Sequence, residues 1–129
     1  MWFETTRVAL TSGVGTGRSH LNAFDHALRD GGIADYNLIK VSSIIPPGTS
    51  VSRLRRSTQP ISGEGLLVPT IYAEMASTEV GAKLAVAVGA GVPTSGISAA
   101  GIVFVASCIG EQEEAEQAVT EMVHEGMDL

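Results

Sequence analysis

Two adjacent serines, Ser42 and Ser43, precede Pro46 and Pro47 in the chain. A serine hydroxyl is a nucleophile once its surroundings activate it. If the backbone here is strained, the Ser43 hydroxyl can attack the carbonyl of Ser42 and turn the amide into an ester. β-Elimination then releases the chain that ends in Ser42, and hydrolysis of the dehydroalanine at position 43 gives a pyruvoyl group. The alternative is a strand that ends in small polar residues, and a Ser-Ser dipeptide alone does not decide between the two.

A glycine-rich segment forms a second candidate site. Gly13, Gly15 and Gly17 lie between an expected strand and an expected helix, where phosphate-binding loops are found. The dinucleotide-binding pattern requires glycine at position 18, where this chain has Arg18, and no Walker lysine follows. We therefore favour a turn, or a mobile loop beside another site, over a nucleotide-binding role.

The histidines and the cysteine do not form a recognisable catalytic or metal-binding pattern. His20 and His26 are six residues apart on one expected helix, so they lie on different faces, and His124 is distant in sequence. Cys108 ends an apolar run, which indicates a buried, inert thiol rather than a nucleophile. We expect no metal site.

Charge and composition exclude several classes of function. The chain has 129 residues, and its 8 basic residues against 14 acidic ones give a net charge of −6. This balance argues against nucleic-acid binding and is compatible with a cationic ligand. The basic cluster Arg53, Arg55 and Arg56 is more typical of a solvated loop or an oligomer contact than of an anion site.

The sequence also indicates where the protein is found in the cell. One cysteine excludes an intrachain disulfide and favours a reducing compartment. No apolar stretch has the length of a membrane span, and the first residues lack the features of a signal peptide. We therefore expect a cytoplasmic protein without membrane contacts.

The elements that must position these residues are short strands and two helices. Apolar residues at three- and four-residue spacing predict a helix over 20–30, ended by Gly31 and Gly32. This helix and the elements listed next together indicate one mixed α+β domain over residues 1–129. The other expected elements are strands over 8–11, 37–43, 66–76 and 100–108, an edge strand within 49–65, a strand or helix over 83–88 closed by Gly89 and Gly91, and a helix over 111–125 ended by Gly126.

Several blocks of sequence together resemble the pyruvoyl-dependent arginine decarboxylase family. The resemblance extends from about Val8 to Met127, and its N-terminal blocks are specific in combination. The matching residues are Leu21 to Asp25 with Ala27 and Leu28, Asn37 and Leu38, Val41 to Ile44, Pro46 and Pro47, Leu67 to Thr70 with Tyr72, and Glu114 to Glu116 with Val119, Glu121, Met122 and Gly126.

The resemblance implies a four-layer αββα sandwich that assembles as a homotrimer or a dimer of trimers. It implies autocatalytic cleavage between Ser42 and Ser43, which gives chains 1–42 and 43–129 and a pyruvoyl cofactor derived from Ser43. The implied reaction converts L-arginine to agmatine and CO2 at the head of a polyamine biosynthesis route. The substrate amine forms a Schiff base with the pyruvoyl ketone, which accepts the electrons released when the carboxylate leaves.

The resemblance also assigns roles to individual residues. Asp25 matches the carboxylate that holds the guanidinium of arginine or a similar cationic amino acid, although on its own it is typical of a solvated helix residue. Leu28 and Ile44 match residues that line the substrate methylene chain. Asn37 matches an asparagine near the cleavage site, which is suited to polarising a carbonyl or binding substrate.

One position departs from the family. An ungapped alignment through Gly101 and Glu114 to Glu116 places Val105 where the family has a glutamate that donates a proton. Valine cannot donate a proton, and neither Cys108 nor Glu111 is an obvious substitute. The alternative hypothesis is therefore an unprocessed or non-catalytic family member with a ligand-binding or structural role.

Overall fold

The computed structural model describes residues 5–54, 63–94 and 99–128. Within them the chain forms two helices and seven strands, which confirms a mixed α+β fold. Contacts divide the chain into two compact units, which we name after their helices. The α2 unit contains residues 1–7, 40–50 and 71–129, and the α1 unit contains residues 8–39 and 51–70.

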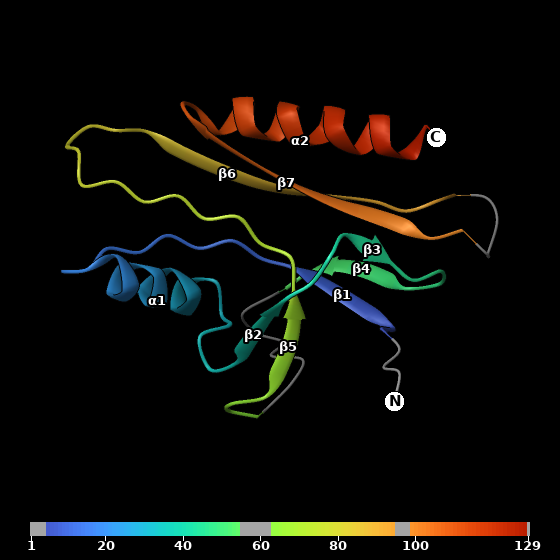
Figure 1. The fold of residues 1–129 in the computed structure, drawn as a ribbon, viewed down its shortest axis with the longest axis horizontal. Helices are drawn as coiled ribbons and strands as arrows, with labels where there is room; N and C mark the ends of the chain where they lie inside the picture. The colour runs from blue at the N-terminus through green and yellow to red at the C-terminus, as the bar shows by residue number, and fades with distance from the viewer. Residues whose placement is uncertain (1–4, 55–62, 95–98, 129) are drawn as a thin grey trace. The chain divides into compact units, whose positions relative to one another are not determined.

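The α2 unit is a helix on an antiparallel sheet. Its strands β3 (Ile44–Ile45), β7 (Gly101–Ile109) and β6 (Leu84–Gly91) pair in that order, and α2 (Gln112–Met127) lies along one face of β6 and β7 (Figure 1). Alternation of small and branched residues explains the sheet, since one face must accept a helix. The residues that the helix buries are Ala115 and Val119.

Glycines let α2 approach the sheet closely. Their role in packing also explains why two predicted boundaries were wrong. A Cβ at Gly91 would lie 2.7 Å from a methyl carbon of Val123, so β6 continues through Gly89 to Gly91 instead of ending before them. A Cβ at Gly126 would lie 2.7 Å from the Phe104 ring, and α2 runs on to Met127. Both glycines serve packing, whereas they were predicted to end their elements.

The α1 unit contains two small sheets and one helix. The pairs are β1 (Arg7–Leu10) with β4 (Ser50–Arg53), and β2 (Asn37–Lys40) with β5 (Leu67–Thr70). The strands predicted over 66–76 and 37–43 are thus both shorter, and the second one ends at Lys40.

The helix α1 (His20–Asp30) has the bounds that were predicted for it. The Ser19 side chain caps its N-terminus by accepting a hydrogen bond from the Asn22 N–H at 3.1 Å. Gly31 caps the other end. The helix has no fully buried residue, and this distinguishes it from α2.

The glycine-rich segment runs alongside α1 (Figure 1). A Cβ at Gly13 would lie 2.1 Å from the Ala27 carbonyl oxygen, and one at Gly15 would lie 2.4 Å from the Ala27 nitrogen. A Cβ at Gly17 would lie 2.7 Å from the Ala23 nitrogen. Alternate residues therefore contact the helix backbone, and the spacing reflects packing rather than a phosphate-binding loop or a tight turn. None of the described helices is long and apolar enough to span a membrane.

Candidate active site

The serine pair lies where the chain enters a sheet. Ser42 is exposed and precedes β3, while Ser43 is half-buried at a bend. The Ser43 carbonyl accepts a hydrogen bond from the Val103 N–H at 2.9 Å, and the next residue, Ile44, pairs with Ile102 of β7. The Ser42–Ser43 peptide bond therefore joins main chain outside the sheet to main chain held by it.

A tight turn holds the other end of this segment. The Thr49 N–H donates to the Pro46 carbonyl at 3.2 Å, and Gly48 has a φ of 78°. Proline followed by glycine with positive φ is typical of the centre of a type II turn. The Thr49 hydroxyl, on a residue only 7% exposed, donates to the Thr5 carbonyl at 3.1 Å. Thr49 was not predicted from the sequence, because a threonine after a turn carries no pattern of its own.

The backbone of the serine pair carries no left-handed strain. Positive φ values among the described residues occur only at glycines, so neither Ser42 nor Ser43 has one. The strain that the self-cleavage hypothesis invokes is therefore not stored as an unfavourable φ at either serine.

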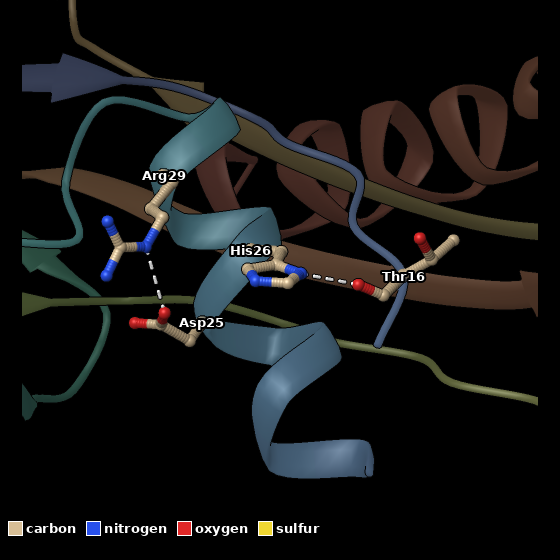
Figure 2. Close-up of polar contacts among 4 residues, drawn as sticks. All are labelled: Thr16, Asp25, His26 and Arg29. Atoms are coloured by element: carbon tan, nitrogen blue, oxygen red, sulfur yellow. Dashed lines mark hydrogen bonds and ion pairs between the residues drawn. The ribbon is translucent and has the colours of Figure 1, made fainter. Parts of the chain in front are cut away.

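Asp25 and Leu28 lie on α1 with a spacing of three residues, which places them on one side of the helix. The Asp25 Oδ2 accepts a hydrogen bond from the Arg29 Nε at 3.0 Å (Figure 2). This bond raises the pKa of the Arg29 guanidinium above its usual value. The Asp25 side chain is 45% exposed, and Leu28 is half-buried.

Asn37 is exposed and fixed at the start of β2. Its main-chain N–H donates to the Leu66 carbonyl at 2.8 Å, and its side-chain Nδ2 donates to the Gly65 carbonyl at 2.9 Å. Gly65 has a φ of 78°, as the turn before β5 requires. The amide oxygen of Asn37 therefore keeps a defined direction.

The structure divides the predicted site residues between the two units. The α2 unit brings Ser42, Ser43 and Ile44 together in one short segment. The α1 unit contains Asp25, Leu28 and Asn37. Arg29 was not predicted as the partner of Asp25, although the four-residue spacing of opposite charges on a helix was an available signal.

Val105 lies on the strand that holds Ser43. It pairs with Val88 of β6 and is half-buried. Side chains alternate along a strand, so Val105 shares a face with Val103, the residue whose N–H binds the Ser43 carbonyl. An acid at position 105 would thus project from β7 two residues along from that contact.

The cysteine, the histidines and the basic cluster considered from the sequence are not among the residues of the proposed site. Cys108 is half-buried rather than buried, with its Sγ 3.9 Å from the Glu111 carbonyl oxygen. The His26 Nδ1 contacts the Thr16 carbonyl oxygen (Figure 2). Arg55 and Arg56 of the basic cluster lie outside the described residues, and no group of three potential metal ligands occurs among the residues that are described.

A groove of about 520 Å³ lies between β6 and α2, and it contains none of the predicted site residues. It is mostly apolar, and Thr120 and His124 are its polar side chains.

Comparison with known proteins identifies the family of the chain as a whole. The family described as pyruvoyl-dependent arginine decarboxylase matches residues 7–129. A protein of that name from Methanococcus vannielii is 34% identical over 122 residues, which are 95% of this chain and 71% of the relative. Its namesake from Pyrococcus horikoshii is 34% identical over 128 residues, covering 99% of this chain and 78% of the relative. A third, from Methanococcus aeolicus, is 38% identical and covers 95% and 70%.

The chain belongs to the pyruvoyl-dependent arginine decarboxylase family, which confirms the resemblance. Its relatives are named as decarboxylases, which are carboxy-lyases, and the family name implies a pyruvoyl prosthetic group. The residues present fit that group. A hydroxyl at Ser43 directly follows the Ser42 carbonyl, and the Val103 N–H holds the main chain just beyond it.

Proposed function

We propose that this protein cleaves itself between Ser42 and Ser43 and then decarboxylates L-arginine to agmatine and CO2. The observation that carries the proposal is the serine pair at the entry to β3, with the Ser43 carbonyl bound by Val103, in a chain of a pyruvoyl-dependent family. The main chain is anchored at Ser43, whereas Ser42 is exposed. This arrangement suits a cleavage that frees the chain ending in Ser42 and leaves Ser43 in place.

The self-processing needs no external oxidant or reductant. The Ser43 oxygen attacks the Ser42 carbonyl carbon, and the peptide nitrogen leaves it to become an amine, so an ester replaces the amide. Loss of the Ser43 Cα proton expels the Ser42 carboxylate and leaves dehydroalanine at position 43. Water then replaces the nitrogen, which departs as ammonia. The ketone that remains supplies an electron sink for decarboxylation.

We assign substrate binding to the residues that the resemblance indicated, namely Asp25, Leu28, Asn37 and Ile44. The exposed part of the Asp25 carboxylate is available to the substrate guanidinium, a charge-assisted pair of the kind that contributes roughly 1.5–3 kcal/mol. Leu28 and the 63% exposed Ile44 offer apolar surface to the methylene chain. Asn37, held by Gly65, directs its amide oxygen or nitrogen at a polar group of substrate or precursor.

Val105 supports a second hypothesis, in which the family member is unprocessed or non-catalytic and binds a ligand or acts structurally. Protonation of the substrate Cα after CO2 leaves needs an acid, and valine has none. A positioned general acid typically contributes about 10²–10⁴-fold in rate. The first hypothesis therefore predicts a slow enzyme, in which water or another side chain delivers this proton.

The change Val105→Glu separates these hypotheses. It should raise the turnover of arginine by about 10²-fold or more if the site is otherwise intact. Val88→Glu makes the same change on the cross-strand partner and should not raise it. No gain with Val105→Glu, in protein that is folded but uncut, would favour the non-catalytic hypothesis.

The remaining features of the proposal concern assembly and location. We infer a homotrimer or dimer of trimers, supported by large apolar side chains at the surface, such as Ile109 and Leu67 at 76% and 68% exposure. The helix-on-sheet packing of the α2 unit supports the αββα sandwich, and the single cysteine supports a cytoplasmic, reducing location for an enzyme of polyamine biosynthesis.

Intact mass under denaturing conditions tests the processing directly. Cleavage predicts two species, 1–42 and 43–129, the longer one lighter by one ammonia than a chain that begins with serine. A single species near 13.4 kDa would contradict self-cleavage. Release of CO2 from carboxyl-labelled arginine by the processed protein then tests the reaction, and its complete absence would contradict the proposed function.

A further inference from the structure

The carboxylate assigned to the substrate guanidinium already holds a guanidinium of the protein itself. Arg29 lies one turn after Asp25 on α1, and its Nε donates to the Asp25 Oδ2 at 3.0 Å. Figure 2 shows the two side chains directed toward each other along the helix. The pair contacts solvent, with side chains 67% exposed for Arg29 and 45% for Asp25.

We propose that Arg29 is an internal competitor for the Asp25 carboxylate, so that it sets the affinity of the site for guanidinium ligands. The inference rests on the proposed function, because it requires Asp25 to bind the substrate. It adds a specificity-determining residue that does not itself contact the reacting atoms.

The chemistry of the two groups makes competition the expected relation. Arginine as a substrate carries the same planar fork as Arg29, and a carboxylate binds such a fork best when both oxygens accept from it. Arg29 uses Oδ2 through one hydrogen bond. A substrate guanidinium that engages both oxygens must share Oδ2 with Arg29 or displace it.

Electrostatic interactions with Arg29 also weaken binding of a substrate guanidinium. If Arg29 stays near Asp25, two cations lie close to one carboxylate and repel each other. If Arg29 moves away, its hydrogen bond to Asp25 is lost. That interaction is favourable, because it raises the pKa of the Arg29 guanidinium. Either course weakens binding of the ligand.

The exposure of the pair limits the size of the effect. Exposed ion pairs on helices contribute little, so removing Arg29 should tighten guanidinium binding about two- to fivefold. The helix should persist in Arg29→Leu, because leucine and arginine have similar helix propensities. Arg29→Gln gives a second variant that removes the charge and keeps a polar side chain.

Agmatine is a suitable probe, since it carries the guanidinium and has no carboxylate to lose. Calorimetric titration of the processed protein with agmatine gives the dissociation constant directly. We expect Arg29→Leu and Arg29→Gln to lower it two- to fivefold and Arg29→Lys to lower it less, because the charge remains. Arg18→Leu makes the same chemical change at an exposed position just before α1 and should leave it unchanged.

Asp25→Asn separates this inference from the proposed function. It should weaken agmatine binding, and adding Arg29→Leu to it should then have no further effect, because the site of competition is gone. Weakened binding by Asp25→Asn without tightening by the Arg29 variants would overturn the competition alone. Unchanged binding by Asp25→Asn would overturn both the competition and the role proposed for Asp25.

Discussion

The segment from Ser43 to Thr49 and the helix α1 hold four of the six predicted site residues, and they hold them in different ways. Main-chain hydrogen bonds and a turn fix the segment, and it includes Ile45, which is 1% exposed. In α1 no residue is fully buried, and its Asp25 contacts a neighbour that solvent also reaches. Ser43, proposed for covalent chemistry, therefore lies on main chain held by hydrogen bonds, whereas Asp25 and Leu28, proposed for binding, lie on a helix without buried residues.

We expect the largest effect from a change that removes the reacting group of the segment without disturbing its packing. Ser43→Ala removes the attacking oxygen, so we expect one uncut species by intact mass and no CO2 from arginine. Ser42→Ala keeps the carbonyl that is attacked and should still yield two fragments. Cleavage of the Ser43→Ala protein at the same bond would contradict the assignment of Ser43.

Neighbouring isoleucines test whether packing holds the segment. Ile45→Ala should lower the free energy of unfolding by about 2–5 kcal/mol, since it removes a buried side chain. Ile44→Ala changes a residue that is 63% exposed and should alter stability by less than about 0.5 kcal/mol. Urea denaturation of both variants measures the difference. Equal losses would mean that the segment is not anchored through Ile45, and a raised KM for Ile44→Ala alone would support its place beside the substrate.

The sequence predicted the bounds of an element well where neighbouring residues mark them. The bounds of α1 were predicted because apolar spacing and Gly31 with Gly32 mark its face and its end. Gly91 and Gly126 misled the prediction, because their role is to let α2 approach β6 and Phe104, and no local pattern distinguishes a glycine needed for packing from one that ends an element.

The candidate site was only partly accessible to sequence reasoning. The serine pair and Asp25 gained their roles from the resemblance, because Ser-Ser and a helical aspartate are both common. The bond from Val103 to Ser43 depends on strand pairing across 60 residues, which the sequence does not display. The Asp25–Arg29 pair was in principle predictable from its four-residue spacing, but nothing local marks it as more than a solvated ion pair.

A smaller effect concerns what holds α1 in its unit. If the glycine-rich segment serves as a packing surface, Gly15→Ala should destabilise the protein by about 1–3 kcal/mol, as overpacking commonly does. The added methyl group would meet helix backbone, at 2.4 Å from the Ala27 nitrogen and 2.5 Å from the Ala23 carbonyl oxygen, and backbone cannot rotate away. Val14→Ala changes the neighbouring residue, which is 82% exposed, and should have an effect below about 0.5 kcal/mol.

Thermal denaturation of these two variants, combined with agmatine titration, shows how strongly the binding residues depend on this packing. We expect Gly15→Ala to lower the melting temperature and also to weaken agmatine binding, because the segment contacts the turns of α1 on either side of Asp25. A destabilised variant with unchanged agmatine affinity would mean that Asp25 does not depend on how the segment supports α1. An undisturbed melting temperature would show that the segment yields to an added methyl group, and the close approach would then not explain the spacing of its glycines.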